Sequence, residues 1–187
     1  MALLGPDDIY LYALRAIPKV TWKYPVADEV QFARVLVALS YEESCRDKNA
    51  EGQVCFNSDA RPVNKNGKRL SSALGLTQML EGTQPWVEAL MGWPERPLDD
   101  RSDPQYAEDL AAAYLAYLYN GGMKVPRGDW YKALVAYHDG HYSKGGAGNS
   151  YARTVIKYLK RFDFAEIARR NASTIAALEF INRGEFR

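Results

Sequence analysis

The stretch Val35-Leu36-Val37-Ala38-Leu39 is the feature that most constrains the fold of this chain. It lies inside a longer segment, roughly Asp28 to Glu43, whose pattern predicts one helix that is apolar on nearly every side. Such a helix is stable only when other elements cover it all round, so we expect it at the centre of a core. Helix signals recur along the rest of the chain and strand-like alternation is almost absent. The sequence therefore predicts a mostly α fold.

Boundary signals predict the positions of the other helices. A first helix is expected near Asp7 to Ala16, and Gly121-Gly122 and Gly184 predict two helix ends. Four later starts carry a capping residue: Asp103 before Pro104, Asp129 before Trp130, Asn149 before Ser150, and Asp163 with Glu166 three residues on.

One long segment, Arg46 to Leu70, is polar and rich in turn residues. Asn66-Gly67, between Val63 and Leu70, predicts a short hairpin within it. A connection of this length inside a compact domain is more often functional or disordered than incidental, and it could form one wall of a cleft. The alternative is an ordinary solvated loop.

Length and composition fit a single domain. The chain has 187 residues, of which 47% are hydrophobic, and this is enough to bury one sizeable core. We expect one domain over residues 1–187, with a core at about 28–160 and a helical C-terminal extension at 161–187.

Charge and hydropathy exclude some classes of partner. Lys plus Arg (24) against Asp plus Glu (23) gives a net charge of +1, without the basic excess expected of a nucleic-acid-binding protein. No stretch approaches the roughly 20 consecutive apolar residues of a membrane span, so no membrane insertion is expected.

The cysteines and histidines do not form a recognisable metal site. Cys45 and Cys55 are the only cysteines, and they could form one disulfide or remain two free thiols. His138 and His141 lie far along the chain, which does not match zinc-site spacing. We predict no metal and no cofactor.

Glu43, followed by Ser44, stands at the end of the apolar helical segment. On a helix Glu43 shares a face with Leu39 and Leu36, whereas Glu42 is rotated by about 100° from it, so only one of the two carboxylates faces a given cleft. A carboxyl group at the mouth of an apolar helix loses hydration in its charged form, which raises its pKa and lets it protonate a glycosidic oxygen near neutral pH. The alternative is that both are ordinary solvated carboxylates at a helix end.

Further motifs follow Glu43-Ser44 in a fixed order. They are Gly75-Leu76-Thr77-Gln78 with Gly82-Thr83, then Asp103-Pro104 through Tyr114-Leu115, then Ala136-Tyr137-His138-Asp139-Gly140, then Ser150-Tyr151-Ala152-Arg153-Thr154-Val155. Each motif alone is weak, but the ordered set over about residues 28–160 resembles the lysozyme-like lytic transglycosylase family, of the soluble lytic transglycosylase type.

The chain departs from the family pattern at several positions. Thr77 replaces the usual Met, Ser72-Ala73-Leu74 stands where a Gly-Ala-Ser-like turn is common, and His138-Asp139 replaces Asn-Ala. The segment between Ala50 and Ser71 is also longer than the family's usual short link. These changes affect the expected substrate detail more than the expected fold.

The resemblance implies a lysozyme-like helical domain with a small loop or hairpin region, and it implies roles for particular residues. Glu43 would be the single catalytic acid/base, Ser44 and Gln78 would orient the acid or the sugar, and Tyr137 would line the cleft. Gly75-Leu76 would let a glycan approach the backbone closely.

Three of these assignments have structural alternatives. Gln78 could equally be a buried structural amide, and Tyr137 a core aromatic residue at helical spacing. His138 is a possible binding residue only, because His138 and its neighbour Asp139 could also form a simple surface pair.

The implied activity is cleavage of the β-1,4 bond between N-acetylmuramic acid and N-acetylglucosamine in peptidoglycan glycan strands, with a 1,6-anhydro product. The alternatives are a hydrolytic muramidase or endolysin of the same fold, a catalytically decayed wall-binding virion component, and an enzyme for a chitin-like polymer. Because Met1 to Asp8 do not resemble a signal peptide, we expect a phage virion protein, or one held in the host cytoplasm before delivery, that acts in the periplasm or cell wall. Other virion proteins would then be partners.

Overall fold

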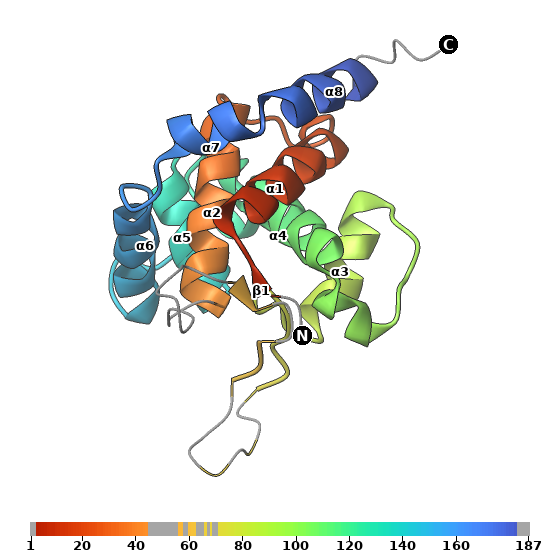
Figure 1. The fold of residues 1–187 in the computed structure, drawn as a ribbon. Coiled ribbons are helices and arrows are strands. Elements are labelled where there is room, and N and C mark those ends of the chain that lie inside the picture. Colours follow the sequence, from red (N-terminus) through yellow and green to blue (C-terminus); the bar gives the residue numbers. More distant parts are fainter. Residues whose placement is uncertain are drawn as a thin grey trace.

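The computed structural model describes residues 3–44, 56–57, 60–62, 66, 68 and 71–182. These residues are mostly helical, as the sequence predicts (Figure 1). The α-helices are α1 (Pro6–Thr21), α2 (Glu29–Ser44), α3 (Thr83–Met91), α4 (Pro104–Tyr119), α5 (Trp130–Asp139), α6 (Ala147–Tyr158), α7 (Phe164–Arg170) and α8 (Ala172–Asn182). Two 3-10 helices, η1 (Leu98–Ser102) and η2 (Gly122–Lys124), flank α4, and β1 (Leu3–Leu4) pairs antiparallel with β2 (Phe56–Asn57).

Helix α2 is the central helix that the apolar stretch predicts. It packs against α1, α4, α6 and β2, and every residue from Val35 to Leu39 is at most 1% exposed. The start agrees as well, because the Asp28 side chain accepts a hydrogen bond from the backbone of Gln31 (2.8 Å). Figure 1 shows α2 running between the α5–α6 pair and α1 and α4.

The first helix is longer than predicted. It continues past Ala16 to Thr21, although Pro18 lies within it. Proline removes one amide donor near the helix end, while Ile17 and Val20 are buried in the core that α1 shares with α4. Packing of the last turn therefore outweighs the local stop signal.

Three predicted N-caps are confirmed, and each side chain accepts a backbone N–H three residues on: Asp103 from Tyr106, Asp129 from Lys132 and Asp163 from Glu166. The prediction for Asn149 is wrong. Helix α6 begins two residues earlier, at Ala147, and the Asn149 side chain donates to the carbonyl of Ser143 (3.1 Å) and accepts from Tyr131 (2.9 Å). Its side chain therefore joins the preceding loop to α5.

The C-terminal extension forms two helices, α7 and α8. Phe164 of α7 is buried and its ring lies 6.0 Å from that of Tyr10 in α1. Arg170 donates twice to the carboxylate of Asp7 (3.0 and 2.8 Å), at the start of α1. Helix α7 is therefore joined to the start of α1 by an ion pair as well as by a ring contact.

Some predictions fall on residues that the structure does not describe. Cys45, Cys55, Gly184 and most of the predicted hairpin from Val63 to Leu70 lie outside the described residues. Within the described part of the chain, no helix combines the length and the apolar character that crossing a bilayer requires.

Candidate functional site

Glu43 lies in the last turn of α2 and is half-buried. Its Oε1 accepts a hydrogen bond from the hydroxyl of Tyr151 at 2.7 Å. Tyr151 belongs to α6 and is only 7% exposed. The contact therefore joins α2 to α6 through two residues that are 108 positions apart in sequence. The side chain of Glu43 is therefore held at the edge of the core.

Two buried phenols interact with the charge on Glu43. Burial raises the pKa of Tyr151 well above 10, and the nearby carboxylate of Glu43 raises it further. The pKa of Tyr137 is raised in the same way, first by burial and then by Glu43. Both hydroxyls therefore stay protonated and act as hydrogen-bond donors near neutral pH.

A tight turn approaches this site from the other side. Gly75 and Gln78 both have positive φ angles (85° and 49°), and the backbone N–H of Leu74 donates to the carbonyl of Met79 (3.3 Å). The Gln78 amide donates to the carbonyls of Ala60 (2.7 Å) and Gly75 (2.8 Å). A non-glycine residue in this conformation is strained, and it persists here because its own side chain locks the turn.

The buried side chain of Arg101 supports the same turn from beneath. It is 2% exposed and donates to the carbonyls of Ser72 (2.9 Å) and Met79 (2.7 Å). The guanidinium group therefore holds both ends of the turn together.

Tyr137 of α5 connects this turn to the rest of the site. Its hydroxyl donates to the backbone carbonyl of Thr77 (3.0 Å), and the Thr77 hydroxyl donates to the carbonyl of Ala107 in α4 (3.2 Å). A cavity of about 200 Å³ opens beside Tyr137. Its lining residues are Gln78, Met79, Leu80, Thr83, Tyr114, Tyr137, His138, Asp139 and Gly140.

His138 lies between the cavity and the Glu43–Tyr151 pair. Its ring is 4.8 Å from the ring of Tyr151, and its Nδ1 is 2.7 Å from Oδ1 of Asp139. The other Asp139 oxygen accepts the backbone N–H of Gly148 (3.1 Å) in the first turn of α6. Asp139 therefore orients His138 and also fixes the helix that carries Tyr151.

The structure brings several predicted site residues together. Gln78, Tyr137 and His138 line one cavity, and Glu43 adjoins it through Tyr151 rather than lining it. The pair that the sequence allowed between His138 and Asp139 is present. The substrate-binding and catalytic roles of these residues stay predictions.

Two other predicted residues face elsewhere. The hydroxyl of Ser44 donates to the carbonyl of Ser40 in its own helix (2.8 Å), not to Glu43. Leu76 is fully buried in the core, so direct contact of its side chain with a glycan would require the turn to open. Gly75 has the positive φ that the turn requires.

The sequence reasoning missed three residues of the site: Tyr151, Arg101 and Glu108. Tyr151 stands inside a motif that was recognised, but nothing local connects it to Glu43. A signal existed for Glu108, because this carboxylate lies just before the apolar run Leu110 to Tyr114. A charged residue at that position of a buried helix is uncommon without a function.

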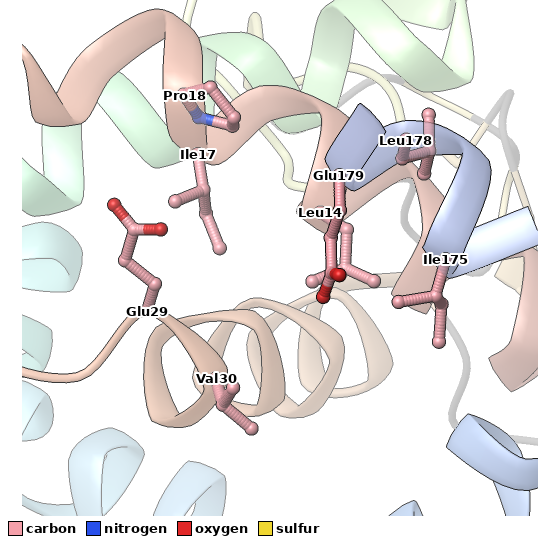
Figure 2. A pocket seen from close by; sticks show the side chains of 8 residues that line it. All are labelled: Leu14, Ile17, Pro18, Glu29, Val30, Ile175, Leu178 and Glu179. Carbon is pink, nitrogen blue, oxygen red and sulfur yellow. The ribbon is translucent and has the colours of Figure 1, made fainter. Parts of the chain in front are cut away.

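A second cavity lies at the opposite end of α2 (Figure 2). It has a volume of about 150 Å³ and is lined by Leu14, Ile17, Pro18, Glu29, Val30, Ile175, Leu178 and Glu179. Figure 2 shows mostly aliphatic side chains from α1, α2 and α8 there. Val30 and Glu43 are separated by about 20 Å of helix, so this cavity is not part of the site around Glu43.

In the part of the chain that the structure describes, no group of three or more His, Cys, Asp or Glu side chains could hold a metal ion. The site around Glu43 holds a half-buried carboxyl group and two tyrosine hydroxyls, which suit acid–base chemistry on a hydroxyl-rich ligand.

Comparison with known proteins assigns the family. A comparison with curated proteins found no match. A family model described as Transglycosylase SLT domain matches residues 25–159, which include Glu43, the Gly75–Gln78 turn, Tyr137 and Tyr151. Because this match covers most of the chain, the protein belongs to the SLT transglycosylase family and is a lytic transglycosylase, a glycosidase of peptidoglycan.

Proposed function

We propose that Glu43 is the single catalytic acid/base, and that it cleaves the β-1,4 bond between N-acetylmuramic acid and N-acetylglucosamine with a 1,6-anhydro product. The observation that supports this most directly is the hydrogen bond from buried Tyr151 to Glu43 Oε1 (2.7 Å). It holds the carboxyl group of Glu43 at the edge of the core, next to a buried hydrogen-bond donor. One carboxyl is sufficient where the substrate supplies the second group.

In the first step, protonated Glu43 donates its proton to the glycosidic oxygen. The bond between this oxygen and C1 breaks, and the N-acetylglucosamine side leaves with a new hydroxyl. The carbonyl oxygen of the N-acetyl group on the muramic acid ring bonds to C1, and the developing positive charge passes to the acetamido group. Glu43 is left as a carboxylate, which the Tyr151 hydroxyl stabilises.

In the second step, the carboxylate of Glu43 removes the proton from the C6 hydroxyl of the same sugar. O6 then attacks C1 and displaces the N-acetyl oxygen, which closes the anhydro ring. Glu43 is protonated again and the acetamido group is restored, so atoms and charges balance without water.

The turn at Gly75–Gln78 and the aromatic side chains serve to bind the glycan in this proposal. The ring centroids of Tyr137 and Tyr114 lie 5.3 Å apart at the cavity. Aromatic rings of this kind pack against the apolar faces of sugars. His138, at the cavity rim, offers a polar contact to hydroxyl or acetamido groups.

The role of Glu43 is tested with Glu43→Gln. The amide keeps the shape of the side chain but cannot donate the acidic proton, so release of soluble muropeptides from purified sacculi should fall by on the order of 10²- to 10⁴-fold. The circular dichroism spectrum and thermal midpoint should stay close to those of the native protein. A variant that retains most of its activity would refute the assignment.

The product distinguishes this mechanism from its hydrolytic alternative. Hydrolysis needs a second carboxylate to position water, and the nearest candidates in sequence are Glu42, Asp47 and Asp59. Mass spectrometry of the released muropeptides should find 1,6-anhydro ends. Hydrated reducing ends alone would favour a muramidase, and binding to sacculi without any release would favour a wall-binding component.

We also propose a setting for the enzyme, a phage virion-associated wall hydrolase that opens a passage for genome entry. This proposal comes from the sequence pattern alone. Detection of the chain in purified particles by mass spectrometry would support it, and an endolysin would instead appear only in the lysate.

A further inference from the structure

Glu108 is a carboxyl group that the proposed reaction does not use, although it lies beneath the site. It belongs to α4, is fully buried, and accepts a hydrogen bond on Oε1 from the hydroxyl of Ser40 in α2. Its other oxygen, Oε2, is buried and has no hydrogen-bond partner among the described residues.

Ser40 places Glu108 in contact with the turn that carries the acid. Ser40 is three residues before Glu43, and its carbonyl accepts the hydroxyl of Ser44 (2.8 Å). Residues three and four apart lie on one face of a helix. The bond from Ser40 to Glu108 therefore ties the last turn of α2 to α4.

The residue before Glu108 ties α4 to the opposite wall of the site. The carbonyl of Ala107 accepts the hydroxyl of Thr77, and the carbonyl of Thr77 accepts the hydroxyl of Tyr137. Neighbouring residues of one helix therefore hold the acid-bearing turn on one side and the Thr77–Gln78 turn on the other.

The surroundings of Glu108 favour its neutral form. Burial raises the pKa of this carboxyl to about 8, and neighbouring Asp109 raises it while the bond from Ser40 lowers it. A charge on Glu108 would also raise the pKa of Tyr137 in α5. The unpartnered Oε2 agrees with this, because a buried charged carboxylate requires partners on both oxygens.

Charged groups on the other elements around α4 are engaged elsewhere. Lys19 of α1 pairs with Asp109 (2.6 Å), not with Glu108. Glu88 of α3 accepts the hydroxyl of Tyr106, and Arg101 of η1 donates to backbone carbonyls. None of these contacts compensates a charge on Glu108.

We propose that Glu108 is a positioning residue, which works as a neutral carboxylic acid and holds the turn carrying Glu43 in register with the Thr77–Gln78 turn. The effect of Glu108 on catalysis depends on the proposed role of Glu43. The claim that Glu108 is neutral in the folded protein does not depend on catalysis.

The first test measures thermal unfolding of the native protein and Glu108→Gln between about pH 5 and pH 8.5. In the unfolded chain the carboxyl ionises near its ordinary pKa of 4.5, whereas in the fold it keeps its proton up to about 8. The native protein therefore loses stability between these two values as the pH rises. Glu108→Gln has no proton to lose. As the pH rises across this range, the thermal midpoint of the variant should therefore increase relative to that of the native protein. If the midpoints of the two proteins changed equally with pH, the proposal that Glu108 is a neutral acid would be overturned, whatever the activity of Glu43.

The second test measures kcat and KM on soluble glycan strands at about pH 6. Glu108→Gln is neutral and can still accept the hydrogen bond from Ser40, so its kcat should stay within about twofold of the native value. Glu108→Leu leaves the Ser40 hydroxyl unpaired and frees the turn, so its kcat should fall by about tenfold with KM little changed. Matching kcat for the Leu variant and the native protein would overturn the positioning role. A loss in both variants would do so too, because rescue by the amide is required.

Discussion

Tyr151 shows how much one hydroxyl contributes at this site. Its O–H donates to Glu43 Oε1, and its ring lies against His138. A hydrogen bond to a carboxylate is worth roughly 1.5–3 kcal/mol, more than a neutral one. It therefore orients the carboxyl group of Glu43 and favours its carboxylate form.

Tyr151→Phe should lower kcat by about tenfold or more while leaving the fold intact, because the ring remains and only the donor is lost. The carboxylate form of Glu43 loses a bond that favours it, so the alkaline limb of the pH–rate profile should move to higher pH. Rates measured across pH on soluble glycan strands check both effects.

Tyr131→Phe is the matched control for this experiment. Tyr131 also places its hydroxyl on α6, but there it donates to the Asn149 side chain (2.9 Å) rather than to Glu43. It should leave the alkaline limb where it is. An equal displacement in both variants would mean that α6 packing, not the bond to the acid, sets the pH dependence.

At the residue scale the sequence predicted the position of Glu43 at the end of a helix but not its partner. Glu43 stands out locally, because it follows an apolar helical run and precedes Ser44. The hydrogen bond to Tyr151 spans 108 positions, and no periodicity or cap links residues so distant. Ser44 shows the converse, since a hydroxyl that sequence reasoning assigned to the site bonds to its own helix.

At the scale of elements, the close packing of α6 on α5 depends on Gly148. A Cβ built there would lie 2.5 Å from Oδ2 of Asp139 and 2.7 Å from the backbone carbonyl of Val135. The carbonyl belongs to α5 and cannot move without the helix. A side chain at position 148 would therefore push the two helices apart.

Gly148→Ala should destabilise the protein by about 1–3 kcal/mol through this overlap, which outweighs the roughly 0.5–1 kcal/mol that alanine gains over glycine inside a helix. Activity should fall as well, because α6 carries Tyr151. Urea unfolding and kcat measurements check these effects.

Gly145→Ala provides the comparison, because a Cβ at Gly145 meets no atom within 4 Å. It should change stability by less than about 0.5 kcal/mol. A neutral Gly148→Ala would show that α5 and α6 can separate without cost.

Helix boundaries were predicted well where they depend on a single side chain. The caps at Asp103, Asp129 and Asp163 act within one turn, so the sequence contains their whole explanation. Asn149 failed as a cap because its side chain bonds to Ser143 and Tyr131 instead. Local propensity decides a boundary only when no tertiary partner competes for the same group.

At the scale of the whole molecule, α7 and α8 cover α1 beyond the residues matched to the family. Phe164 is 7% exposed, and its ring lies near those of Tyr10 and Phe162. The guanidinium group of Arg34 lies over the same ring, with its Cζ 5.7 Å from the ring centroid. The extension is therefore joined to the core by a buried aromatic contact.

Phe164→Ala should lower the free energy of unfolding by about 3 kcal/mol, since it leaves a cavity between α7 and α1. Phe180→Ala, on the exposed side of α8, should cost less than about 0.5 kcal/mol, because Phe180 is 44% exposed. Chemical denaturation of both variants compares them directly. A loss as small for Phe164→Ala as for Phe180→Ala would mean that the packing of α7 on α1 contributes little to stability.

The sequence by itself determined the helical class, the central helix and the position of Glu43 at the end of that helix. These features depend on interactions within one helix, where burial periodicity and capping act over three or four residues. The tertiary structure alone decided that Tyr151 bonds to Glu43, that Arg101 locks the Gly75–Gln78 turn, and that Glu108 is buried against Ser40. Those contacts join residues far apart in the chain, and only the packing of whole helices brings them within hydrogen-bonding distance.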